Sequence, residues 1–286
     1  MILINDLKHN ILNSMKIISK DEYNISEVIS ELIDGSGLVY LPKIFNKKQV
    51  EKARDIIINE TQDGIETGGS HFNQRDSDVK EQRRVWNLIN IDNVFVEMVT
   101  HPKIISIMGE FLGTDFVMGS ICASRTMPGF KGQEPHIDYP YWDFYREKSF
   151  PSRINSTFPL NGQATIIIDP FTEKTGATAY KPGSQKILHY PKKDDNFFEN
   201  FDLMLGNPGD LILFNGAVWH CAMPNKSKTG RIGILIEFLP KFVKPVEDML
   251  TDLDQEFIEK ASPIMRQLLG FNYPWPSTPP HHPLEF

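Results

Sequence analysis

The middle of this chain is divided into short apolar segments by turn clusters that contain Pro and Gly. Apolar runs bounded in this way predict strands. The predicted strands are residues 116–126, 163–168, 177–180, 211–214 and 231–239. Many short strands with tight turns, preceded and followed by helical patterns, are typical of a β core inside a helical shell. The sequence therefore predicts a mainly β fold, a double-stranded β-helix (jelly roll) flanked by N- and C-terminal helices.

Helix signals lie on both sides of this core. Asn46 to Gln49 form a capping box, and His101-Pro102 starts a further helix, so we interpret His101 as a helix-start residue rather than a ligand. After the strands, Pro245 and Ser262-Pro263 predict helix starts, and Gly270 predicts a helix end.

We predict one domain over all 286 residues. Its helical N-terminal part covers residues 1–114, the jelly-roll core covers about 115–240, and C-terminal helices with a Pro-rich tail cover 241–286.

Two histidines and one aspartate form the main candidate site. His136 and Asp138 are separated by one residue, so on a strand their side chains project from the same face. His220 follows 84 residues after His136, just beyond a predicted strand. Two imidazoles and a carboxylate can bind one face of an iron(II) ion and leave the opposite face open. A His-x-Asp pair alone is also consistent with a surface hydrogen bond. The prediction of a metal site therefore depends on the residues around His220.

Arg231 lies eleven residues after His220, at the start of an apolar strand, and supports the prediction of a metal site. We expect the two residues at the facing ends of two strands joined by one hairpin. Gly233, Leu235 and Glu237 would share one face of the second strand. A buried arginine there needs a partner, either a structural salt bridge or the carboxylate of a co-substrate, which suits the planar guanidinium.

These residues resemble the phytanoyl-CoA dioxygenase family of iron(II)/2-oxoglutarate oxygenases. The matching positions are His136, Asp138, His220 and Arg231. Residues 176–184 (Gly-Ala-Thr-Ala-Tyr-Lys-Pro-Gly-Ser) are similar to the family's strand and Pro-Gly-Ser turn, with Thr175 in place of Asn and Gln185 in place of His. The resemblance spans roughly residues 35–240.

The resemblance implies iron(II) bound by His136, Asp138 and His220, with 2-oxoglutarate on Arg231 and O2 as the second co-substrate. It implies hydroxylation of a small-molecule metabolite or natural-product intermediate, with release of succinate and CO2. The metal centre is the only catalytic group expected. Asp138 favours hydroxylation over halogenation, because related halogenases carry a small residue there. The alternatives are a non-oxidative jelly-roll metalloenzyme (lyase or isomerase) and a metal-stabilised small-molecule-binding module.

Two further co-substrate contacts are expected from the resemblance, at Arg84 and at Thr165. Arg125 is expected to face the pocket and bind substrate.

An aromatic stretch directly follows the metal-binding triplet. Its members Tyr139, Tyr141, Trp142 and Asp143 are predicted to bind substrate, as a lid or as a cage for a cation. The alternative is a loop anchored by buried aromatic rings.

Composition narrows the class of partner. The net charge is −7 and no sustained basic run occurs, so we expect a small-molecule substrate and neither a nucleic acid nor a membrane partner. Two cysteines and the lack of an N-terminal apolar segment predict a cytoplasmic protein. Monomer and homodimer are equally compatible with the sequence.

Overall fold

The structure is a computed structural model. It describes residues 15–19, 22–63, 65, 81–138, 159–187, 189–251 and 253–272. Within them, no helix is both long and apolar enough to cross a membrane.

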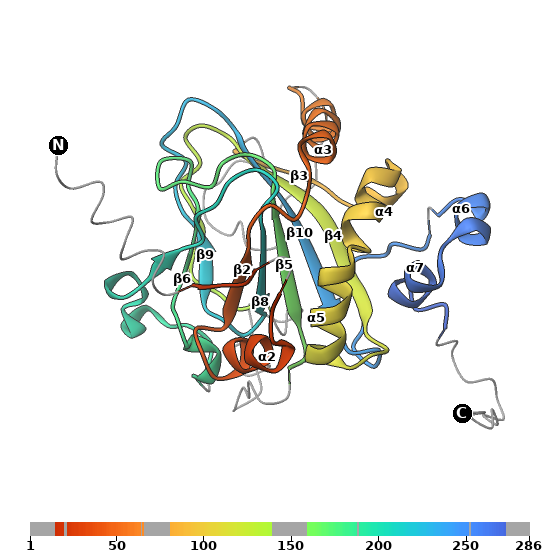
Figure 1. The fold of residues 1–286 in the computed structure, drawn as a ribbon. Coiled ribbons are helices and arrows are strands. Elements are labelled where there is room, and N and C mark those ends of the chain that lie inside the picture. Colours follow the sequence, from red (N-terminus) through yellow and green to blue (C-terminus); the bar gives the residue numbers. More distant parts are fainter. Residues whose placement is uncertain are drawn as a thin grey trace.

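Two sheets face each other in this part of the chain (Figure 1). The larger has seven strands in the order β1-β2-β8-β5-β10-β4-β3 and the smaller has three in the order β7-β6-β9. Only β1 and β2 pair in parallel among these strands. The strands of the larger sheet are β1 (Lys16–Ile17), β2 (Leu38–Leu41), β3 (Gln82–Val85), β4 (Val117–Thr126), β5 (Gly162–Ile167), β8 (Leu211–Asn215) and β10 (Arg231–Leu239). Those of the smaller sheet are β6 (Thr178–Tyr180), β7 (Asp202–Leu203) and β9 (His220–Ala222).

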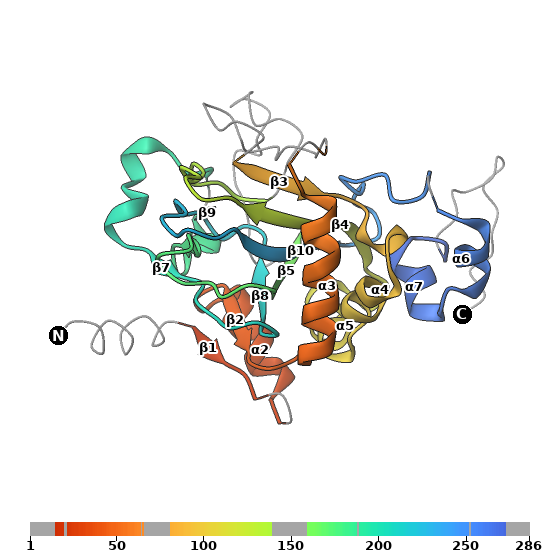
Figure 2. The ribbon, with the colours of Figure 1, turned by 90° about the horizontal axis from the view of Figure 1, so that it is seen from above.

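Helices lie on the outer side of the larger sheet, with α6 farthest from it (Figure 1). They are α2 (Ile25–Ile33), α3 (Lys47–Glu60), α4 (Asn93–Val99), α5 (Pro102–Leu112), α6 (Gln255–Lys260) and α7 (Pro263–Leu268). Short 3-10 helices are Leu88–Asn90, Ser184–Lys186, Lys193–Asp195 and Phe197–Glu199. Figure 2 shows α3, α4, α5 and α7 on one side of the larger sheet and β7 and β9 on the other.

Alternation along each strand produces two separate layers. On β10, Ile232, Ile234 and Ile236 pack into a hydrophobic core with α2, α4, α5 and α7, which we call the helix-side layer. The residues between them face the smaller sheet. The space between the two sheets, which we call the inter-sheet layer, has its own core built around Trp219 and Phe214.

The five predicted strands are confirmed to within two residues at each end. The predicted hairpin between His220 and Arg231 is wrong. β9 pairs with β6 in the smaller sheet, whereas β10 pairs with β4 and β5 in the larger one. Residues 223–230 therefore cross from one sheet to the other, and local sequence does not reveal this because either connection needs the same polar loop.

Three of the four predicted helix starts are confirmed. Asn46 forms the capping box with Gln49, His101 accepts from the backbone N–H of Lys103, and Ser262 caps α7. No helix begins at Pro245. Its neighbour Glu247 donates its backbone N–H to Gly119 and accepts that of Ile121, which holds this segment against β4 instead.

Candidate metal centre

Backbone pairing brings together residues that lie far apart in the chain. His136 and His220 form an isolated antiparallel bridge, with N···O distances of 2.9 Å and 3.0 Å in the two directions. Two residues further on, Asp138 donates its backbone N–H to Gly216 at 2.8 Å. The registered pairing places all three candidate side chains on one side of the inter-sheet layer.

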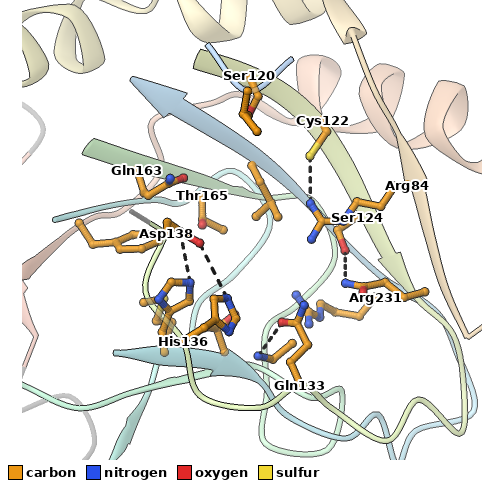
Figure 3. A pocket seen from close by; sticks show the side chains of 18 of the residues that line it. Arg84, Ser120, Cys122, Ser124, Gln133, His136, Asp138, Gln163, Thr165 and Arg231 are labelled. Atoms are coloured by element: carbon orange, nitrogen blue, oxygen red, sulfur yellow. Dashed lines mark hydrogen bonds and ion pairs between the residues drawn. The ribbon is translucent and has the colours of Figure 1, made fainter. Parts of the chain in front are cut away.

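The donor atoms of His136, Asp138 and His220 converge. Figure 3 shows His136 and Asp138 side by side at the cavity. One donor atom from each side chain lies within 4.8 Å of the others. Nε2 of His220 is 3.3 Å from one Asp138 carboxylate oxygen, and Nε2 of His136 is 3.8 Å from the other. Among the described residues, these three form the one cluster able to hold a metal ion.

Both imidazoles are oriented through their other nitrogen. Nδ1 of His136 lies 2.8 Å from the carbonyl oxygen of Glu134, and Nδ1 of His220 lies 2.9 Å from that of Val218. A carbonyl only accepts, so each Nδ1 donates, and each Nε2 is the nitrogen that would bind a metal once its ring is neutral. Two neutral imidazoles and a carboxylate are a donor set that fits iron(II).

Burial and mutual charge set the protonation of the cluster. Burial, with the neighbouring His220, lowers the pKa of His136 to about 3, so this ring is neutral near pH 7. Burial alone would raise the pKa of Asp138, but the charge and hydrogen bond of His220 outweigh it and lower that pKa. The same pairing outweighs burial at His220 and raises the pKa of its imidazole, so metal binding would release the Nε2 proton of this ring. Asp138 is therefore an ionised, buried carboxylate that attracts a cation.

Asn161 connects the segments that carry these residues. Its backbone carbonyl accepts from Gly216 N at 3.0 Å, and its side-chain amide donates to the Asp138 carbonyl at 3.4 Å and to Glu237. The amide oxygen accepts from Gln163 at 2.8 Å. A Cβ atom on Gly216 would lie 2.3 Å from that oxygen, so only glycine allows this approach.

The Pro-Gly-Ser turn supports the His220 strand from behind. The Ser184 hydroxyl accepts from Trp219 N at 2.8 Å, and Lys181 N donates to the Trp219 carbonyl at 2.9 Å. Gln185, which stands where the resembling family has His, donates to the carbonyls of Ile33 and Gly35. It therefore ties the turn to the end of α2 rather than to the metal cluster.

A cavity of about 100 Å³ lies between the cluster and the larger sheet. Strand register arranges the cavity-facing residues of that sheet in rows. Arg231 faces Thr126, which in turn faces Gln82 on β3. In the next row Ser124 lies between Gly233 and Arg84. Leu235 lies between Cys122 and Thr165, and Glu237 lies between Ser120 and Gln163. The cavity thus has a basic end near Arg231 and Arg84, and Ser120 and Gln163 line it at the other end of these rows.

Arg231 is buried, with 3% of its surface exposed. Its guanidinium lies 4.2 Å from the centre of the Phe171 ring, and Nη2 donates to the Gly176 carbonyl at 2.8 Å. Among the described residues Nε has no hydrogen-bond partner, and no carboxylate forms an ion pair with this arginine. The structural salt bridge considered from the sequence is therefore not observed within the described chain. Burial lowers the pKa of Arg231 to about 10, so it stays cationic at neutral pH.

Two other residues expected at the site line the same cavity. Arg84 donates to Cys122 Sγ at 3.1 Å and lies over the Trp86 ring, and Thr165 projects from β5. Arg125 does not line it, so its predicted position is wrong. Alternation turns it to the other face of β4, where it donates to the Thr61 hydroxyl at 3.0 Å.

Several cavity residues were not predicted. They are Gln82, Trp86, Ser120, Cys122, Ser124, Gln133, Gln163, Thr178, Met204, Phe214, Ala222, Leu235 and Val246. The sequence held a signal for some of them, because polar or small residues recur at every second position of β4 and β5. Tyr139, Tyr141, Trp142 and Asp143, predicted to bind substrate, lie outside the described residues.

Solved structures share this fold. The alpha-ketoglutarate-dependent epimerase SnoN of nogalamycin biosynthesis, solved with Fe3+, alpha-ketoglutarate and nogalamycin RO, superposes with a TM-score of 0.59 at 13% identity. The alignment covers 80% of this chain and 92% of SnoN. EvdMO1 superposes with a TM-score of 0.55 at 18% identity, covering 75% of this chain and 50% of that one. The sheets and helices described above therefore have the fold of 2-oxoglutarate-dependent enzymes.

Curated proteins that are similar to this chain in sequence are named dioxygenases. The dioxygenase af480 of Aspergillus fumigatus is 21% identical, covering 83% of this chain and 74% of its own length. The dioxygenase andF of Emericella variicolor is 23% identical, covering 86% and 84%. The dioxygenase cdmA of Talaromyces verruculosus is 26% identical, covering 89% and 86%.

The model of one family matches residues 33–233. This chain belongs to the phytanoyl-CoA dioxygenase (PhyH) family. Iron(II), 2-oxoglutarate and O2 are the cofactor and co-substrates of that family, which confirms the cofactors expected from the sequence.

Proposed function

We propose that this protein hydroxylates a small molecule, using iron(II) held by His136, Asp138 and His220 and 2-oxoglutarate held by Arg231. One observation carries the proposal: three buried donor side chains and a buried arginine without an acidic partner among the described residues line the same cavity. Iron(II), when bound, supplies the activation of O2 that the protein's own side chains do not provide.

The two histidines and Asp138 have distinct tasks. The Glu134 and Val218 carbonyls hold the imidazoles with Nε2 directed at the metal position. Asp138 supplies the negative charge that attracts a divalent metal ion into this buried position. Because these three groups occupy one side of the cavity, the side toward β4 and β10 stays open for co-substrate and substrate.

Arg231 would bind the distal carboxylate of 2-oxoglutarate through its planar fork. Phe171 fixes the plane of the guanidinium from one side, and the Gly176 carbonyl takes one N–H group. Arg84 adds a second positive charge at this end of the cavity, and the Thr165 hydroxyl lies on the wall between the arginines and Asp138. A dianionic co-substrate is suited to this basic end.

The substrate would occupy the opposite end, where Ser120 and Gln163 offer neutral hydrogen-bonding groups. Tyr139, Tyr141, Trp142 and Asp143 remain proposed substrate contacts, since they directly follow Asp138 in the chain. We infer that the two facing sheets form a double-stranded β-helix and that the chain is a single oxygenase domain.

The decisive experiment measures succinate formed from 2-oxoglutarate by the anaerobically iron-loaded protein after exposure to O2, against a panel of small molecules. Stimulation of succinate by one compound, with gain of one oxygen atom in its mass spectrum, supports hydroxylation. Succinate with a product of unchanged mass would replace hydroxylation by an isomer-forming outcome on the same centre. Metal binding without any 2-oxoglutarate turnover would leave the non-oxidative metalloenzyme or the binding module.

A further inference from the structure

The buried carboxylate of Asp169 lies near Arg231 but accepts its hydrogen bonds from Arg54 and Ile232. Asp169 follows β5, and one of its oxygens accepts from Nε of Arg54 at 2.6 Å. The other oxygen accepts from the backbone N–H of Ile232 at 3.1 Å. Asp169 is 8% exposed, whereas the side chain of Arg54, on α3, is 45% exposed.

Asp169 is also near enough to act on Arg231 electrostatically. Burial lowers the pKa of Arg231, and the negative charge of Asp169 acts in the opposite direction. The two do not form an ion pair; Arg231 uses the Gly176 carbonyl and the Phe171 ring instead. Among the charged side chains of the described residues, Arg54 is the one that forms an ion pair with Asp169, and Arg125 interacts with Asp169 through its charge alone.

We propose that Arg54 is a positioning residue for 2-oxoglutarate: by holding and neutralising Asp169 on the helix side, it leaves the Arg231 guanidinium to an external carboxylate. This inference rests on the proposed role of Arg231. Arg54 itself does not line the cavity, so it would act only through Asp169.

The physical reason is competition for one guanidinium. In a low-dielectric interior an arginine and a nearby free carboxylate attract each other strongly, and an internal partner competes with any ligand for the same N–H groups. Arg54 removes most of that competition because its charge cancels the charge of Asp169. Since Arg54 is half-exposed, solvent and salt screen its contribution, and the effect is smaller than that of losing Arg231.

The test is calorimetric titration of 2-oxoglutarate into the full-length, anaerobic, iron(II)-loaded protein. We expect Arg54→Met to weaken 2-oxoglutarate binding about 3- to 10-fold at low salt, with less effect at high salt and no change in iron affinity. Arg54→Lys, which keeps the charge, should retain most of the affinity. The matched control is Lys52→Met, on the same helix, similarly exposed and paired with Asp92 at 2.6 Å instead of Asp169. Lys52→Met should leave the affinity unchanged.

A double-variant cycle identifies Asp169 as the intermediary. Asp169→Asn keeps an acceptor for Ile232 N but removes the charge, so adding Arg54→Met to it should change 2-oxoglutarate binding very little. Equal weakening with and without Asp169→Asn would overturn the inference, and so would unchanged binding in Arg54→Met alone. Arg231→Ala separates the two levels: if it leaves 2-oxoglutarate binding intact, the proposed role of Arg231 fails, whatever Arg54 does.

Discussion

The helix-side layer and the inter-sheet layer share the strands of the larger sheet but bury different kinds of side chain. In the helix-side layer, β10 contributes Ile232, Ile234 and Ile236, all essentially inaccessible to solvent. In the inter-sheet layer the same strand contributes Arg231, and Glu237 is buried next to Asn161. Burying an arginine and a carboxylate costs stability, whereas burying isoleucines stabilises the fold. The comparison indicates that one layer supplies the free energy of folding and the other uses part of it to hold a polar site.

The largest expected effect is on the inter-sheet side. Asp138→Ala removes the carboxylate donor, and we expect iron affinity to fall by more than about 100-fold, because even residues that only support a ligand cost 10- to 100-fold. Metal titration followed by calorimetry measures this. The metal-free variant should also lose some stability, because His220 loses the buried carboxylate with which it pairs. Unchanged iron binding would contradict the assignment of the site.

The helix-side counterpart is Ile234→Ala. The isoleucine is fully buried among helices, so its truncation should cost on the order of 2–5 kcal/mol of the free energy of unfolding. Denaturant titration gives this value. Iron and 2-oxoglutarate affinities of the folded fraction should match the unaltered protein. A variant that loses co-substrate affinity without losing stability would show that the two layers are not separable.

Arg231→Ala tests the basic end of the cavity. Loss of a charge-assisted pair to a carboxylate should weaken 2-oxoglutarate binding by about 2–4 kcal/mol, with iron affinity nearly unchanged. Arg231→Lys should recover part of the loss, because a lysine keeps the charge but not the planar fork. The apparent KM for 2-oxoglutarate is the measurement. A change in stability alone would make Arg231 a structural residue.

The smallest effect concerns Glu247, which is hydrogen-bonded to β4, a strand that both layers share. It accepts from Ile121 N beside an irregularity in the β4–β10 pairing, and burial raises its pKa from 4.5 to about 7. The folded state therefore binds this proton more tightly than the unfolded chain. The stability that follows from it is complete below about pH 4.5 and is lost as the pH rises to about 7.

We expect Glu247→Gln to remove this dependence. Because the group is only half-buried, the difference in unfolding free energy between the two proteins should change by about 1–2 kcal/mol from about pH 5 to about pH 8. The variant should be relatively more stable at the higher pH. Parallel curves for the two proteins across this range would show that Glu247 has an ordinary pKa.

The sequence was sufficient for the strands and for the composition of the metal cluster. Alternation along residues 231–239 is enough to place Ile232 and Arg231 on opposite faces of β10, because side chains on a strand have a period of two. The same rule predicted that His136 and Asp138 project together. It failed for Arg125, since the alternation that places Ser124 toward the cavity turns Arg125 away, and the register of β4 was not anchored by any motif.

What the sequence determined by itself is local: strand periodicity, helix caps such as that of Asn46, and the set of donor types that suits iron(II). Only the tertiary structure decided that His136 and His220 oppose each other, that residues 223–230 cross between sheets, and that Asp169 pairs with Arg54 instead of Arg231. These are pairings between distant segments, fixed by the packing of two sheets and a helix layer. No short stretch of sequence carries that information, because each partner's residue type is compatible with several alternatives.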